Sequence, residues 1–206
     1  SIDVPEGVEE LGYGTFQGCS SIKSIVVPEA LLTIPSYLFM DCTSLESVQL
    51  PEIYMAIGYA AFYNCASLKE ITLPETLQTI GSNVFAGCSS LKRVVIPNSV
   101  TSIGEGSFKG CSSLESVTLS SSLEIIDRFM FEGCRSLVDI RIPSNVKEIE
   151  TRAFKGCTSL TVLFLPESVV EVWHKICDGC PSITIYLEKE DQLVTWEKYW
   201  NYYDDQ

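Results

Sequence analysis

The chain has 206 residues, 27 of them acidic and 14 basic, so its formal net charge at pH 7 is −13. This charge disfavours a nucleic-acid partner, because such binders neutralise phosphates with clustered Lys and Arg. The chain is 46% hydrophobic and 20% charged, which excludes a disordered tail, and it lacks the run of about 18 to 20 apolar residues that spans a bilayer.

The first four residues show no basic start followed by an apolar segment. We therefore expect any export signal or anchor to lie outside this chain, and no direct membrane insertion by the chain itself.

A repeat of 23 residues organises the sequence. Its proline positions are Pro5, Pro28, Pro51, Pro74, Pro97, Pro143 and Pro166, with Ser120 in the one gap. Phenylalanine recurs on the same lattice from Phe16 to Phe154, and cysteine from Cys19 to Cys180. We predict one solenoid domain over residues 1–188, without insertion or deletion, with coils that start at residues 5, 28, 51, 74, 97, 120, 143 and 166.

Residues 74–96 show the elements expected in each coil. Residues 77–80 predict a short extended piece that Gly81 ends. Residues 84–88 are too few for an ordinary helix and predict one helical or 3₁₀ turn. The position before each cysteine holds only Gly, Asn or Asp, which predicts a left-handed backbone there. Residues 92–96 alternate in polarity and predict a strand.

The last segment, residues 189–206, predicts a helix. Leu193, Trp196, Trp200 and Tyr203 recur at spacings of three and four, which is one apolar helical stripe. We interpret this helix as a cap over the open end of the core. The alternative is an exposed aromatic platform for carbohydrate.

The repeat closely resembles the BspA-type (Treponema-type) leucine-rich repeat. Its pattern is Pro-x-x-Val/Leu-x-x-Ile-Gly-x-x-Ala/Val-Phe-x-Gly-Cys-x-Ser-Leu-x-x-Ile-x-Ile/Leu. The resemblance implies an α/β solenoid: a right-handed β/α superhelix with a concave parallel strand column, short convex-side strands, helical turns and a C-terminal capping helix. The chain departs from the pattern at Ser120, Pro35, Asp127, Glu150, Trp173 and Cys177.

The cysteines are the most conspicuous candidates for chemistry. Equivalent thiols on stacked coils would lie about 4.8 Å apart, but their parallel Cβ vectors disfavour disulfides, so we interpret them as a buried core column. We expect the segment from His174 to Cys180 to pack in the core, and the alternative is that it binds a metal or acts as a redox-active dithiol. The sequence does not decide whether Cys177 and Cys180 form a disulfide. One histidine cannot activate the serine that follows each cysteine by two positions, so we predict no enzyme, no metal and no cofactor.

The outward positions of the strand column hold charged residues in some coils and polar or apolar residues in others, so core packing does not determine them. We take as tentative ligand-binding residues Glu70, Arg93, Asp139, Arg141, Val162 and Phe164. Val162 and Phe164 form an expected apolar patch with Ile185 and Leu187, and either contacts with the cap or a partner site explains it.

The resemblance implies an adhesive or recognition module at the cell surface or outside the cell. We expect a monomer that binds a protein or glycan of a host or neighbouring cell through the concave face. The alternative is a structural spacer in a larger surface protein, with no ligand of its own.

Overall fold

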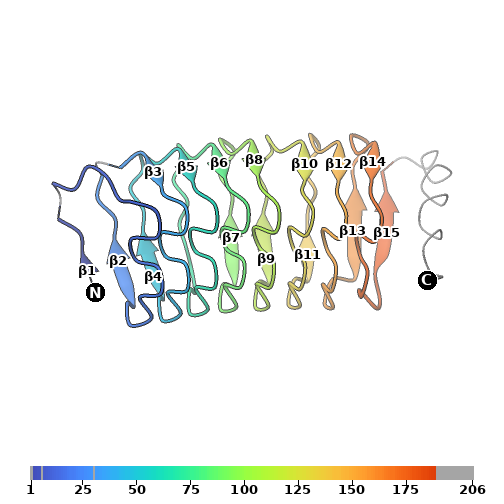
Figure 1. Ribbon diagram of the computed structural model, residues 1–206. Helices are drawn as coiled ribbons and strands as arrows, with labels where there is room; N and C mark the ends of the chain where they lie inside the picture. The colour runs from blue at the N-terminus through green and yellow to red at the C-terminus, as the bar shows by residue number, and fades with distance from the viewer. Residues whose placement is uncertain (1, 6, 30, 189–206) are drawn as a thin grey trace.

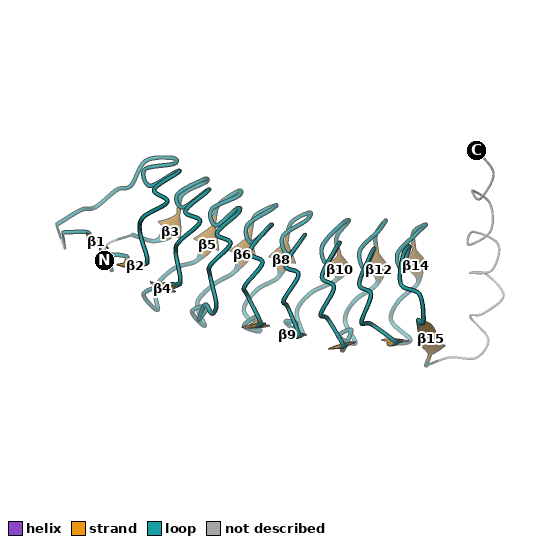
Figure 2. Ribbon diagram, turned by 90° about the horizontal axis from the view of Figure 1, so that it is seen from below, coloured by secondary structure: helices purple, strands orange, loops and turns teal. Residues whose placement is uncertain are grey.

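The computed structural model describes residues 2–5, 7–29 and 31–188. Its coils follow one another in a line, and the chain advances by one coil with each repeat (Figure 1). Two columns of parallel strands run along this stack, and the view in Figure 2 separates them.

The first column, here called the long-strand column, confirms the strand predicted for residues 92–96. Apart from β15, its paired members are parallel with a 23-residue offset, as in Arg93 with Ser116 and Ser116 with Asp139. The coil with Glu70 has no strand at residues 70–72, so one strand per repeat was wrong for that coil. The strands are β1 (Ile2–Asp3), β2 (Ser24–Val26), β4 (Ser47–Gln49), β7 (Arg93–Val95), β9 (Ser116–Thr118), β11 (Asp139–Ile140), β13 (Val162–Leu165) and β15 (Thr184–Leu187).

The second column consists of two-residue strands and confirms the short extended piece. It divides into a four-stranded sheet, β3-β5-β6-β8, and a three-stranded sheet, β10-β12-β14. The strands are β3 (Thr33–Ile34), β5 (Ala56–Ile57), β6 (Thr79–Ile80), β8 (Ser102–Ile103), β10 (Ile125–Ile126), β12 (Glu148–Ile149) and β14 (Glu171–Val172).

The predicted helical turns are wrong, because the described residues contain no helix and form a β-solenoid. In the turn of the fourth coil, the amides of Asn83, Phe85 and Gly87 donate to carbonyls of the next coil. The amides of Ala86 and Cys88 instead donate to carbonyls three residues back in their own coil. Every second amide thus leaves the coil, whereas a helix keeps all of them within it. The predicted capping helix over residues 189–206 lies outside the described residues.

Two positions in each turn have a left-handed backbone. The predicted one precedes the cysteine and is confirmed, with φ of 60° at Asp41 and 79° at Gly87. The other, four residues earlier, could not be predicted from residue type, because large side chains occupy it in several coils. The residues at this second position are Gly14, Tyr37, Ala60, Asn83, Gly106, Phe129, Arg152 and Lys175.

The last strand departs from the lattice. Strand β15 pairs with β13 at an offset of 22 residues, so Phe164 lies beside Tyr186. A uniform repeat of 23 residues up to residue 188 was therefore wrong. The shift turns Ile185 and Leu187 toward the core and leaves the side chain of Glu188 exposed, whereas the unshifted lattice would bury Glu188.

In the core, equivalent residues of successive coils stack in columns, among them one of phenylalanine and one of cysteine. The rings from Phe16 to Phe154 stack with centroids 5.3 to 5.6 Å apart. Beside them, seven cysteines at 23-residue spacing, from Cys42 to Cys180, donate their thiol hydrogens to the carbonyl of a phenylalanine in the preceding coil, as Cys88 Sγ does to Phe62 O at 3.2 Å. The cysteine therefore fills space and also satisfies a buried acceptor.

Ion pairs on the surface repeat the same register. All six ion pairs among the described residues join side chains 23 positions apart. Lys109 with Glu132 at 2.9 Å and Lys155 with Asp178 at 3.4 Å are two examples. A slip of one residue would separate these partners, so the pairs favour the native stacking of coils even though each exposed pair contributes only about 0–1 kcal/mol.

Candidate functional site

The outward side chains of the long-strand column form the candidate site, here called the long-strand face. Each strand of three residues buries its middle side chain, as β7 does with Val94, and turns its first and third side chains outward. The exposed positions include large apolar side chains, which burial in the core does not explain: Val26 (51% exposed), Val95 (63%), Phe164 (61%) and Tyr186 (49%).

Three neighbouring coils bring Arg141, Phe164 and Tyr186 into one row. Arg141 and Phe164 pair through a parallel β-bridge, and Phe164 pairs with Tyr186 in the sheet of β13 and β15. The rings of Phe164 and Tyr186 stack with centroids 5.0 Å apart and planes inclined by 20°. Each ring therefore covers one face of the other, and both side chains stay exposed to solvent.

The predicted apolar patch needs correction at two positions. Val162 is partly buried and Phe164 is exposed, but Ile185 and Leu187 pack against the core. The register shift in β15 is the cause, because it moves Tyr186 into the outward position. The strict alternation of Ile183, Ile185 and Leu187 in the sequence was the signal that could have revealed this.

The charged residues predicted for the site occupy separate places along the face. Asp139 begins β11, with Arg141 two residues further on the same side. Arg93 lies two coils before Asp139, which is about 10 Å at the usual strand spacing. Glu70 is exposed in the coil without a strand. None of these four side chains joins an ion pair among the described residues.

The cysteine column does not form a reactive site. All nine cysteines are free, and only Cys19 is less than fully buried. Burial raises the pKa of Cys42 to about 11 and that of Cys111 to about 12, so both stay protonated at neutral pH. A hydrogen bond with Cys180, together with burial, raises the pKa of Cys177. No disulfide joins this pair, and the described residues contain no group of three His, Cys, Asp or Glu that could hold a metal ion.

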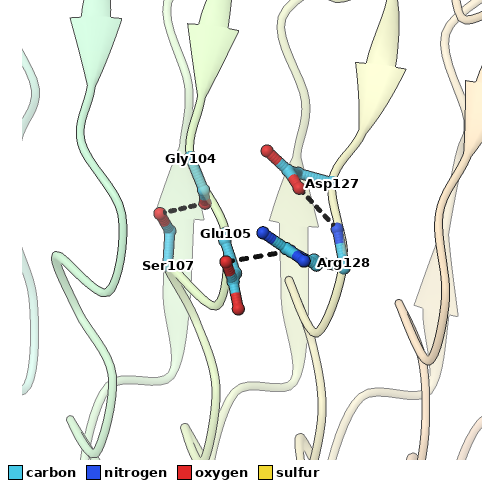
Figure 3. Close-up of polar contacts among 5 residues, drawn as sticks. All are labelled: Gly104, Glu105, Ser107, Asp127 and Arg128. Atoms are coloured by element: carbon cyan, nitrogen blue, oxygen red, sulfur yellow. Dashed lines mark hydrogen bonds and ion pairs between the residues drawn. The ribbon is translucent and has the colours of Figure 1, made fainter.

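The short-strand column is interrupted once, and this break is here called the seam. The two carboxylates whose pKa is raised, Asp127 and Glu150, lie beside it. It lies between β8 and β10, where Gly104 gives way to Asp127 at the position after the strand. Arg128 spans the seam by donating from Nε to Glu105 Oε2 at 2.9 Å, while its amide donates to Asp127 Oδ1 at 2.7 Å (Figure 3). Burial raises the pKa of Asp127 and that of Glu150. The ion pair of Arg128 with Glu105 joins the coils on the two sides of the seam.

The seam follows from how closely coils approach at this position. Across the short-strand column, amides at this position donate to the isoleucine of the previous coil, as Gly81 does to Ile57 and Glu150 to Ile126, both at 2.9 Å. The equivalent bond from Asp127 to Ile103 is missing. The bond is present where Gly58 follows Pro35, between coils that both have glycine here and between coils that both have larger residues. Among the described coils it is lost where Asp127 follows Gly104.

Comparison with known proteins places the chain among bacterial repeat proteins. Residues 1–101 and 79–202 match the BspA type leucine rich repeat region, in six copies. No curated protein matches.

Solved structures share the fold. A leucine-rich repeat protein from Bacteroides ovatus has a TM-score of 0.80 at 30% identity, over 89% of this chain and 56% of that one. The T. pallidum leucine rich repeat protein has a TM-score of 0.69 at 29% identity, over 98% and 83%. A leucine rich cell surface protein from Faecalibacterium prausnitzii has a TM-score of 0.50 at 24% identity, over 87% and 63%. The chain thus spans little more than half of the Bacteroides protein.

Proposed function

Because the chain belongs to the BspA-type leucine-rich repeat family, we propose that it is a non-enzymatic recognition module that binds a protein through the long-strand face. The observation that carries this proposal is the row of Arg141, Phe164 and Tyr186. It leaves two aromatic rings and an unpaired guanidinium in solvent on a face that the core does not determine.

The geometry of the row favours a protein over a glycan. A sugar ring stacks on an aromatic face, and the stack of Phe164 and Tyr186 takes one face of each ring away from a ligand. Ring edges suit contact with apolar and aromatic side chains, and a guanidinium binds a carboxylate through two parallel hydrogen bonds. Arg, Tyr and Phe are also the residues enriched in protein interfaces.

We place this recognition outside the cell, with the chain acting as a monomer. The F. prausnitzii protein is named as a cell surface protein, and that location is extended to this chain as part of the proposal. The described residues include no helix long and apolar enough to cross a membrane.

The experiment replaces Arg93, Arg141 and Phe164 together by serine and measures binding to immobilised extracellular-matrix extract and to intact cells. A matched control replaces Arg135, Lys147 and Val170, which are exposed away from the long-strand face. We expect the first variant to lose at least tenfold in affinity and the control to bind like the wild type. Protease treatment of the matrix should abolish binding, and periodate treatment should not.

Equal binding by both variants would reject this face as the site. If the wild-type chain binds neither surface, the alternative of a structural spacer is favoured, because the unbroken core columns from Phe16 to Phe154 make a continuous stack that could hold another domain at a distance.

A further inference from the structure

Four tyrosines gather on the turns of the first three coils, away from the long-strand face. Here called the tyrosine edge, they are Tyr13 (82% exposed), Tyr37 (38%), Tyr59 (44%) and Tyr63 (38%). The stacking of coils brings them together: Tyr37 N donates to Tyr59 O at 2.9 Å, and Gly14, next to Tyr13, is itself adjacent to Tyr37.

The rings of this edge keep faces open to solvent. Tyr37 and Tyr59 pack edge to face, with centroids 5.2 Å apart and planes inclined by 68°. In such a pair only one face of one ring is covered by the other ring. In the parallel stack of Phe164 and Tyr186, by contrast, one face of each ring is covered by the other ring.

A pair of polar side chains lies beside Tyr63. Asp41 N donates to Tyr63 O at 2.8 Å, and Asn64 Nδ2 donates to Asp41 Oδ1 at 2.8 Å. The second carboxylate oxygen of Asp41 and the remaining amide groups of Asn64 have hydrogen-bonding capacity to spare. Donors and acceptors therefore lie in the same turns as the tyrosines, four residues after Tyr37 and five after Tyr59.

The charge of the turns changes along the solenoid. Asp41 is the only charged residue in the turns of the first three coils, which are residues 13–18, 36–41 and 59–64. The corresponding turns of the last four coils carry charges in ion-pair ladders, such as Lys109 with Glu132 and Arg128 with Glu105. The tyrosine edge thus has no cation to attract an acidic polymer and no exposed Leu, Ile, Val or Phe to bury against a protein.

The backbone at Tyr37 is left-handed, as it is at the equivalent position of the other coils. Tyr37 has a φ of 63°, in the left-handed region that bulky residues rarely adopt. Gly14, Asn83 and Gly106 occupy the same position in other coils and adopt this conformation at lower cost. Phe129, Arg152 and Lys175 occupy the same position with φ of 57°, 58° and 59°, so the strain belongs to the repeat, and asparagine in place of Tyr37 should relieve it without loss of the fold.

We propose that the tyrosine edge is a binding site for a neutral glycan, separate from the long-strand face. The C–H faces of a sugar ring pack on the open faces of Tyr37 and Tyr59, and the sugar hydroxyls exchange hydrogen bonds with Asp41 and Asn64. The module then has two sites of different chemistry, one for a protein and one for carbohydrate.

The test measures binding of four neutral oligosaccharides, chitotriose, cellotriose, maltotriose and lacto-N-tetraose, by titration calorimetry and saturation-transfer NMR. Tyr37→Asn removes one ring and relieves the left-handed strain, so this variant folds at least as well as the wild type. We expect Tyr37→Asn and Tyr59→Ser each to weaken binding of the recognised sugar by about 2- to 10-fold, the usual range for one aromatic contact. Tyr59→Phe keeps the ring and should bind within about twofold of the wild type.

Tyr186→Ser on the long-strand face is the matched control and should leave oligosaccharide binding unchanged. The proposal is overturned if none of the four sugars binds, if Tyr37→Asn binds as well as the wild type, or if Tyr186→Ser removes binding. It is also overturned if light scattering shows that the tyrosine edge mediates self-association that Tyr59→Ser abolishes. Failure of this site would leave the matrix-binding test of the long-strand face unaffected.

Discussion

Two kinds of glycine recur in the coils, and they should resist substitution for different reasons. Gly104, after β8, lies against the preceding coil: a Cβ built on it would be 2.6 Å from Ser82 N and 2.9 Å from Ser82 Cα. Gly110, before a cysteine, has space, since a Cβ would meet nothing closer than 3.8 Å, but its φ is 73°. The first glycine permits close approach of coils, and the second permits a left-handed backbone.

The expected losses of stability follow from these geometries. Gly104→Ala forces two backbones apart, which costs about 1–3 kcal/mol as overpacking, and it weakens the bond from Gly104 N to Ile80 O. Gly110→Ala should cost about 1–2 kcal/mol from left-handed strain without moving the coils. The control is Gly7→Ala, because Gly7 has no atom within 4 Å of a built Cβ and no positive φ. It should be neutral, or stabilise by about 0.4–1 kcal/mol.

Urea unfolding and amide hydrogen exchange together separate the two causes. At an m-value of about 2 kcal/mol per M, a loss of 2 kcal/mol lowers the midpoint by about 1 M. Exchange at residue 104 should accelerate in Gly104→Ala and stay slow in Gly110→Ala. If Gly104→Ala unfolds at the midpoint of Gly7→Ala, close approach of coils does not explain the glycine at this position.

Two further predictions concern titratable groups. Burial raises the pKa of Asp127, so its ionisation destabilises the folded state as pH rises from about 3.9, the value in the unfolded chain, through the folded pKa. Asp127→Asn should therefore raise the urea midpoint at pH 7 and lose this advantage near pH 3.5, and an equal gain at both pH values would contradict burial as the cause. Iodoacetamide at pH 8 should label Cys19 in the native protein and the other cysteines only after unfolding, because they are buried and burial holds the pKa of Cys111 at about 12. Rapid native labelling of Cys111, read by mass spectrometry, would contradict this.

The sequence predicted the features that depend on side-chain columns. The lattice of proline, phenylalanine and cysteine gave the register of Arg93 with Ser116, the buried cysteine column and the two strand columns. These follow because a one-residue column can stack only if every coil has the same length.

Features that depend on where backbone amides find partners could not be predicted in the same way. The residues 84–88 are compatible with a helical turn, and only the neighbouring coil decides that Phe85 N donates to Ser107 O. The left-handed position at Tyr37, Phe129 and Arg152 is likewise invisible in residue type, since those side chains disfavour it. Of the candidate site, Phe164 and Arg141 were placed correctly on the exposed face, whereas Tyr186 was missed because the fixed lattice was extended through a coil that is one residue shorter.

The distribution of basic residues gives the long-strand face its distinct character. The chain has 14 basic residues against 27 acidic ones, and six of the basic residues in the part that the structure describes are in ion pairs between neighbouring coils. Arg93 and Arg141 are not among these pairs, although acidic side chains outnumber basic ones throughout the chain. Such a guanidinium keeps its capacity for a carboxylate of a partner. Salt screens the surrounding negative charge beyond about 8 Å at physiological ionic strength, so that charge neither attracts nor repels a distant partner strongly. Discrimination on this face therefore depends on contact at Arg141 and the adjoining rings, and long-range attraction contributes little.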